Sequence, residues 1–189
     1  MTKGCICYMK QYYLEDFKNK EQYCKFINYM VENSDKFSLV YFKYSENGKV
    51  KSTVKEMEKL LRPYKIFSYN GNQWPSTVTL NENNHIYKIT LYKVAPGVEE
   101  ILTKPNDLLD WDYPNLPMDL CFYKNGYSWF ASAAHEHYAS VYLETKQEYL
   151  NLIDLGIDMS FVKDVDQSKL FLESSLKVKV KSFSEANHI

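Results

Sequence analysis

Two apolar runs flank the tripeptide Lys124-Asn125-Gly126, and no other feature of the sequence constrains the fold as strongly. Asn-Gly is the strongest short signal for a β-hairpin turn, because both residues tolerate the positive φ angles that a tight turn needs. The runs before and after it, 118–123 and 127–133, are therefore expected to pair as antiparallel strands.

Stretches on both sides of this hairpin are β-branched and aromatic or alternate between apolar and polar residues, as strands do. Strands are predicted over 36–44, 64–69, 77–81, 85–94 and 138–144. The third and fourth of these are joined by Asn81-Glu82-Asn83-Asn84, which predicts a second hairpin. Over 176–181 Val alternates with Lys, which predicts an edge strand with a solvated Lys face.

Segments with apolar residues at helical spacing lie between these strands. Helices are predicted over 19–33, 52–61, 96–102, 145–155 and 165–174. Ser52 or Thr53 is expected to cap the second helix, and Thr145 is expected to cap the fourth, which ends at Gly156. The inward face of the fourth helix is expected to carry Tyr149, Leu150, Leu152 and Ile153.

The mixed order of hairpins and isolated helices indicates an α+β fold, with a mainly antiparallel sheet built from hairpins and three or four helices packed on one face. The length of 189 residues fits a single domain over 1–189. Residues 104–117 hold three prolines and show no periodicity. They form either an ordered long loop or a boundary between an N-terminal α/β lobe (1–103) and a C-terminal hairpin-and-helix lobe (118–189).

The charge balance argues against several classes of partner. The net charge is −1 and Arg62 is the only arginine, whereas specific reading of phosphates and base edges relies on arginine. Nucleic acid is therefore disfavoured, with a weak contact through the Lys-faced strand left as an alternative. The sequence shows no apolar run of about 18 residues and no secretory leader. We expect a cytoplasmic protein without membrane contact, whose thiols are free: Cys5, Cys7, Cys24 and Cys121.

The polar triplet His135-Glu136-His137 interrupts a long apolar stretch and permits two interpretations. Residues i and i+2 of a strand share a face, so both imidazoles could bind one metal ion in a small metal-dependent hydrolase, with His85 as a third ligand. His-x-His alone is a weak pattern, and we favour a polar turn between two strands. No metal or other cofactor is expected, since neither a Gly-rich phosphate loop nor a Gly-x-Ser-x-Gly elbow is present.

A second local cluster is Trp111-Asp112-Tyr113-Pro114. Aromatic and acidic side chains on a Pro-rich loop can form a surface that binds a protein, or they can pin the loop to the core. Cys121 lies in an apolar strand, where a structural thiol is the common role, so no catalytic residue is assigned. The expected binding surface comprises Trp111, Asp112, Tyr113, Asp119, Trp129, His135, Glu136 and His137.

Three segments carry a family resemblance: Trp111-Asp112-Tyr113-Pro114, Pro117-Met118-Asp119-Leu120 and Ser132-Ala133-Ala134-His135-Glu136. Over about residues 35–157 the chain resembles small cytosolic proteins of clostridia and related bacteria that are labelled stage III sporulation protein AH. The sporulation protein proper has a membrane anchor and a ring-building extracytoplasmic domain, and this sequence departs from it because no anchor is expected. The resemblance implies a bacterial host range and a fold, and it supplies no defined catalytic residues that could be carried over to this sequence.

These features favour a non-enzymatic, cytosolic protein-interaction module over an enzyme. The expected setting is sporulation or the inhibition of a bacterial defence system by a phage or mobile element. The partner is expected to be a protein whose identity the sequence does not give, and a homo-oligomer is left open.

Overall fold

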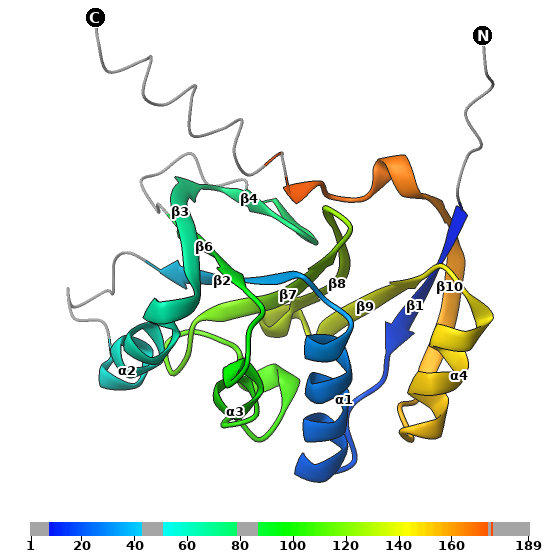
Figure 1. The fold of residues 1–189 in the computed structure, drawn as a ribbon, viewed down its shortest axis with the longest axis horizontal. Helices are drawn as coiled ribbons and strands as arrows, with labels where there is room; N and C mark the ends of the chain where they lie inside the picture. Colours follow the sequence, from blue (N-terminus) through cyan, green and yellow to red (C-terminus); the bar gives the residue numbers. More distant parts are fainter. Residues whose placement is uncertain (1–7, 43–50, 79–86, 174, 176–189) are drawn as a thin grey trace, which may run out of the picture.

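The computed structural model describes residues 8–42, 51–78, 87–173 and 175. Their main feature is an eight-stranded sheet in the order β10-β1-β9-β8-β7-β2-β6-β3 (Figure 1). Every neighbouring pair of strands in it is antiparallel. The strands are β1 (Tyr8–Leu14), β2 (Lys36–Phe42), β3 (Lys65–Gly71), β6 (Tyr87–Lys93), β7 (Met118–Lys124), β8 (Tyr127–Ala133), β9 (Tyr138–Leu143) and β10 (Met159–Asp166).

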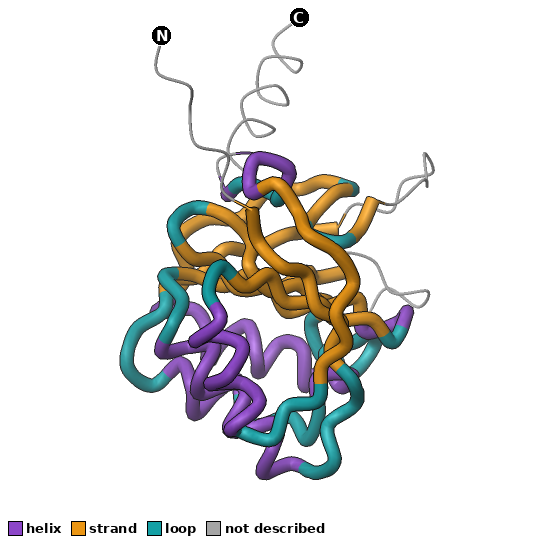
Figure 2. The backbone as a smooth tube through the Cα atoms, turned by 90° about the vertical axis from the view of Figure 1, so that its right-hand side faces the viewer, coloured by secondary structure: helices purple, strands orange, loops and turns teal. Residues whose placement is uncertain are grey.

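Four α-helices cover one face of this sheet, as Figure 2 shows from the side. They are α1 (Lys20–Glu32), α2 (Ser52–Leu61), α3 (Val98–Leu102) and α4 (Lys146–Asp154). A two-stranded sheet, β4 (Gln73–Trp74) with β5 (Thr77–Val78), is separate from the large one. Short 3₁₀ helices are η1 (Arg62–Tyr64), η2 (Leu108–Asp110), η3 (Ala134–Glu136) and η4 (Gln167–Lys169). The predicted α+β class, with an antiparallel sheet and helices on one face, is confirmed.

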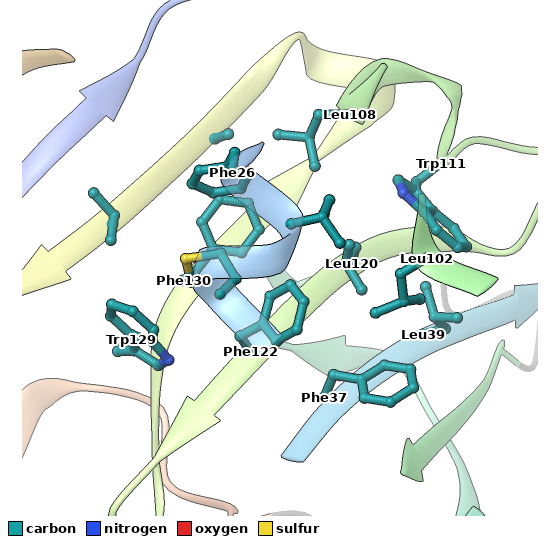
Figure 3. Close-up of a cluster of buried hydrophobic side chains, with 14 of the residues drawn as sticks. Phe26, Phe37, Leu39, Leu102, Leu108, Trp111, Leu120, Phe122, Trp129 and Phe130 are labelled. Atoms are coloured by element: carbon teal, nitrogen blue, oxygen red, sulfur yellow. The ribbon is translucent and has the colours of Figure 1, made fainter. Parts of the chain in front are cut away.

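The main core lies between the helices and the sheet (Figure 3). The helix α1 contributes Tyr23, Phe26, Ile27 and Met30, which recur at helical spacing and are fully buried. Its first turn is capped by Asn19, whose Oδ1 accepts a hydrogen bond from the Gln22 backbone N–H at 2.9 Å. Burial of each such large apolar side chain contributes about 1.5–3 kcal/mol, so this layer accounts for much of the stability.

A smaller core lies on the opposite face of the sheet, because successive residues of a strand point to opposite sides. On β7, Leu120 and Phe122 belong to the main core, whereas Cys121 and Tyr123 belong to this second one. Trp74 of β4 is 2% exposed and packs into the second core. The face without helices is therefore not bare, and the β4–β5 sheet covers part of it.

The hairpin predicted around Asn125-Gly126 is confirmed, and these two residues have φ angles of 53° and 85°. The predicted cap of α4 is also confirmed, since Thr145 accepts from the Glu148 backbone N–H and Gly156 follows the helix with a φ of 82°. The predicted cap of α2 is wrong, because Lys51 occupies that position and no side chain caps the helix. The Thr53 hydroxyl instead donates to the Asn115 carbonyl at 2.5 Å.

Other predictions need correction or lie outside the described residues. Two expected inward residues of α4, Leu150 and Ile153, are 38% and 37% exposed. The helix predicted over 165–174 is wrong at its start, where β10 runs to Asp166 and the 3₁₀ helix η4 follows. The two strands of the predicted second hairpin have other partners in their described parts. Thr77–Val78 pair with β4, whereas β6 pairs with β2 and β3. The rest of the predicted second hairpin, over 79–86, and the Lys-faced strand over 176–181 lie outside the described residues.

The segment 104–117 is an ordered loop that contains η2 and the fully buried Trp111. The large sheet combines strands from both sides of this loop, since β1 lies between β9 and β10. Within the described ranges, no helix has the length and apolar character needed to cross a membrane.

Candidate functional site

The loop 111–119 and the turn 134–137 are joined by the carboxylate of Asp119 at the start of β7. Its Oδ1 accepts a hydrogen bond from the Ala134 backbone N–H at 3.2 Å, and its Oδ2 accepts one from Trp74 Nε1 at 2.8 Å. The Asp119 N–H donates to the carbonyl of Trp111 at 3.2 Å. One residue therefore fixes the loop, the turn and the β4–β5 sheet relative to one another.

The backbone at Asp119 explains how its side chain reaches these partners. Its φ is 54°, in the left-handed region, and the pairing of β7 with β2 shifts between Ser38 and Val40. Such a bulge breaks the regular alternation of a strand and re-aims the side chain next to it. Asp is among the few residue types that adopt this conformation readily.

The electrostatics of the site centre on the pair Asp119 and His135. The Asp119 side chain is fully buried, and this burial raises its pKa to about 6, although the hydrogen bond from Trp74 and the nearby His135 act in the opposite direction. His135 Nδ1 lies 3.9 Å from Asp119 Oδ1, and His135 Nε2 lies 3.6 Å from Glu136 Oε1. The half-exposed imidazole is thus placed between two carboxylates.

Three residues of the expected binding surface, Asp119, Trp111 and Trp129, are buried in the described structure, so the expectation that they form part of the surface is wrong. Trp111 is fully buried, and its Nε1 donates to the Tyr23 hydroxyl at 2.9 Å. Trp129 is 1% exposed, and its Nε1 donates to Ser34 Oγ at 2.9 Å. Neither indole presents its ring to solvent, so both belong to the packing of the core.

The remaining residues of the expected surface do reach solvent. His135, Glu136 and His137 are exposed on the turn, and Asp112 and Tyr113 are half-buried on the loop. The turn itself is confirmed, since η3 separates β8 from β9 and His137 has a φ of 50°. We refer to Asp112, Tyr113, His135, Glu136 and His137 as the loop–turn surface.

An aromatic row next to this surface was not predicted. The ring centroids of Trp74 and Tyr87 are 5.0 Å apart, those of Tyr87 and Phe42 are 5.3 Å apart, and those of Phe42 and Tyr113 are 5.0 Å apart. The row leads from buried Trp74 to half-buried Tyr113. Its members come from β4, β6, β2 and the loop, so no local sequence pattern could reveal it.

Two hollows flank the loop. One, of about 400 Å³, is lined by Thr53, Leu109, Asp110, Asp112, Tyr113, Asn115 and Leu116. The other, of about 20 Å³, is lined in part by Glu15, Asp16, Asp107 and His137, and has room for about one water molecule. Carboxylates line both hollows, and Lys51 Nζ donates to Asn115 Oδ1 of the larger one at 2.7 Å.

The geometry offers little support for a metal site at the triplet. His135 and His137 lie on and just after a 3₁₀ turn, so they do not share one face of a strand. His135 approaches Asp119, whereas His137 lines the small hollow. His85 lies outside the described residues, and among those described no group of three or more His, Cys, Asp or Glu side chains could hold a metal ion.

The thiol of Cys121 is buried, and burial raises its pKa well above the ordinary value for a cysteine. It donates a weak hydrogen bond to the Asp119 carbonyl at 3.5 Å. A protonated, inaccessible thiol is a poor nucleophile, because the thiolate is the reactive form. The described part of the site therefore holds a half-exposed imidazole and carboxylates, and Cys121 adds no reactive group.

Comparisons with protein-family models, with curated proteins and with solved structures gave no match. The resemblance to the sporulation-labelled proteins over residues 35–157 stays a prediction. Inference about function therefore starts from the geometry and charge of the loop–turn surface.

Proposed function

We propose that this chain is a non-enzymatic protein-interaction module and that the loop–turn surface contacts the partner. The observation that carries the proposal is the position of Asp119, whose buried carboxylate accepts from the Ala134 N–H of the turn and whose backbone N–H donates to the Trp111 carbonyl of the loop. A surface held in one conformation before binding loses less conformational entropy when the partner arrives.

The partner that suits this surface is a protein with basic side chains. The hollow of about 400 Å³ carries the carboxylates of Asp110 and Asp112 beside the ring of Tyr113. An arginine or lysine entering it could pair with a carboxylate and lie against the aromatic ring. Glu136 on the neighbouring turn extends the acidic character, so charge attraction would also speed the encounter.

The alternative functions receive less support from this geometry. The acidic surface would repel a nucleic-acid backbone, and the Lys-faced segment 176–181 lies outside the described residues. A metal-dependent hydrolase would need a third ligand beside His135 and His137. A role in sporulation and a role as an inhibitor of a defence enzyme would each use a protein-binding surface, so the surface can be tested before the process is known.

The test is site-specific photo-crosslinking in the native host. A photo-crosslinking residue replaces exposed His135 in one sample and exposed Glu32, at the end of α1, in the matched control. We expect a discrete covalent adduct from position 135 and none from position 32. A second variant, Glu136→Lys, should remove the adduct at position 135 by charge reversal.

Two outcomes contradict the proposal. One is the same adducts from positions 135 and 32, which would mean that the crosslinks are not specific to the surface. The other is an adduct at position 135 that Glu136→Lys leaves undiminished, which would mean that acidic charge does not direct the contact. Circular dichroism of each variant checks that the fold is retained.

A further inference from the structure

The strand β10 forms one end of the large sheet, remote in the strand order from the β7–β2 pair that carries Asp119. It pairs with β1 along one side, and no described strand pairs with its other side. Its residues Phe161 and Val162 are 54% and 47% exposed. An open strand edge with exposed apolar side chains is a template for pairing with another strand.

The exposed ring of Phe161 is held in place by its neighbours on β1. Its centroid is 5.7 Å from that of Tyr12, and Lys10 Nζ lies 5.1 Å above it. The register between β10 and β1 shifts between Gln11 and Tyr12, so Val162 has no direct partner on β1. These contacts order the edge of the strand and leave its apolar atoms in solvent.

The helix α4 adds a second exposed apolar feature on the same side of the molecule. Figure 1 shows α4 beside β10, and the Tyr149 ring of α4 lies 5.0 Å from that of Tyr12. One turn of this helix exposes Leu150 and Ile153, the residues that sequence periodicity placed in the core. Between α4 and the strands lies a hollow of about 570 Å³, lined in part by Tyr8, Tyr12 and Tyr149.

From these features we infer that a second copy of this chain binds at the β10 edge, with the two β10 strands antiparallel. A two-fold axis perpendicular to the sheet relates antiparallel edge strands and keeps the helices of both copies on the same face. The exposed sides of the two α4 helices then face each other across the axis. One symmetry operation would therefore cover both apolar features.

The charges of β10 suit a copy of itself. The strand carries both signs, with Lys163 next to Asp164. If Val162 lies on the two-fold axis opposite Val162 of the second copy, then Phe161 faces Lys163 of that copy and Ser160 faces Asp164. Over residues 160–164 this register places no like charges directly opposite each other, and it sets a cation beside an aromatic ring. At each end Asp166 faces Asp158 of the second copy, whose charge is paired with Lys18 at 2.8 Å.

The contact is small compared with a standard protein–protein interface. Eight strand residues and one side of a short helix are fewer than the roughly 20–30 residues that each partner gives to a standard interface. We therefore expect a reversible dimer with a dissociation constant on the order of micromolar. The contact is independent of the loop–turn surface, so the failure of one proposal leaves the other intact.

The test is sedimentation equilibrium of the full chain over a concentration series from about 0.1 to about 100 micromolar, a range that brackets the expected constant. The mass should rise from 22.4 kDa towards twice that value. Val162→Lys places two like charges at the axis and should weaken the dimer at least tenfold. Val78→Lys is the matched control, since Val78 is 62% exposed on β5 and outside the contact.

Three results would overturn the inference. A monomer at every concentration would show that the edge does not self-associate. A wild-type-like dimer of Val162→Lys, with the fold verified by circular dichroism, would place the contact elsewhere. Masses that grow beyond the dimer would indicate an open, head-to-tail contact between different edges instead of a closed two-fold pair.

Discussion

The indole Nε1 of Trp74 donates a hydrogen bond to the buried carboxylate of Asp119 at 2.8 Å. This contact links the β4–β5 sheet to the start of β7, and the other carboxylate oxygen holds the turn at Ala134. The two hydrogen bonds to Asp119 use both of its oxygens, whereas an amide in its place would offer only one acceptor oxygen. The stability of this end of the sheet should therefore depend on Asp119 and on its protonation.

The first prediction concerns pH. Burial raises the pKa of Asp119 from 3.8 to about 6, so the folded state binds this proton more tightly than the unfolded state does. The stabilisation is complete below pH 4 and is lost as the pH rises through 6. Each unit of difference between the folded-state and unfolded-state pKa corresponds to about 1.4 kcal/mol. The contribution of Asp119 to the free energy of unfolding should therefore fall by about 2–3 kcal/mol across this pH range.

The measurement is urea unfolding of the wild type and of Asp119→Asn at several pH values between 4 and 7. The variant removes this titration and keeps the shape, so the difference in unfolding free energy between the two proteins isolates the carboxylate. That difference should move steadily in favour of the variant as the pH rises. A difference that is independent of pH would show that Asp119 does not titrate in this window.

The second prediction separates a packing role of Trp111 from a binding role. Trp111→Phe deletes the hydrogen bond to the Tyr23 hydroxyl and leaves a cavity among fully buried residues. The loss of unfolding free energy should be about 2–4 kcal/mol, measured by urea unfolding. Tyr113→Ser, at a half-buried position, should cost less than half as much. Equal stability of wild type and Trp111→Phe would contradict the burial of this indole.

The third prediction compares two glycines with positive φ. Gly126 has a φ of 85°, and a Cβ there would meet nothing within 4 Å, so Gly126→Ala should cost about 1–2 kcal/mol from backbone strain alone. Gly97 has a φ of 91°, and its Cβ would lie 2.8 Å from the Tyr64 hydroxyl. Gly97→Ala should therefore lower the melting temperature more than Gly126→Ala, and the reverse order would contradict this packing.

The fourth prediction compares helix caps. Thr145 accepts from the Glu148 backbone N–H, and the Glu148 side chain accepts from the Thr145 N–H at 3.0 Å. Thr145→Ala should cost about 1 kcal/mol of unfolding free energy. Ser52 begins α2 without capping it, so Ser52→Ala should change stability by less than about 0.5 kcal/mol. Equal effects of the two substitutions would show that the capping box of α4 contributes little.

The sequence revealed elements whose signals are local. The Asn125-Gly126 hairpin and the helices α1 and α4 depend on turn chemistry, capping and periodicity within a dozen residues, and all three were predicted. The strands β1 and β10 were missed because neither shows clear alternation. Most of β10 is exposed on both faces, and Gln11 of β1 is buried although it is polar.

The candidate site was predicted only in part, for a related reason. The loop and the turn were both identified, but the Trp74–Asp119 hydrogen bond joins residues 45 positions apart and has no local signature. An aromatic residue in an acidic loop has the same sequence appearance whether it faces solvent or the core. The structure separates the two cases, placing Trp111 in the core and leaving Tyr113 half-exposed.

The central claim is that the loop–turn surface binds a protein partner through its acidic charge. The most direct measurement is the yield of the adduct formed by the crosslinker at position 135, in the presence of Asp112→Lys or of the control Glu32→Lys. Both variants reverse one charge, and their unfolding free energies are compared in parallel. We expect Asp112→Lys to lower the yield at least tenfold and Glu32→Lys to leave it unchanged, whereas equal yields from the two folded variants would contradict the claim.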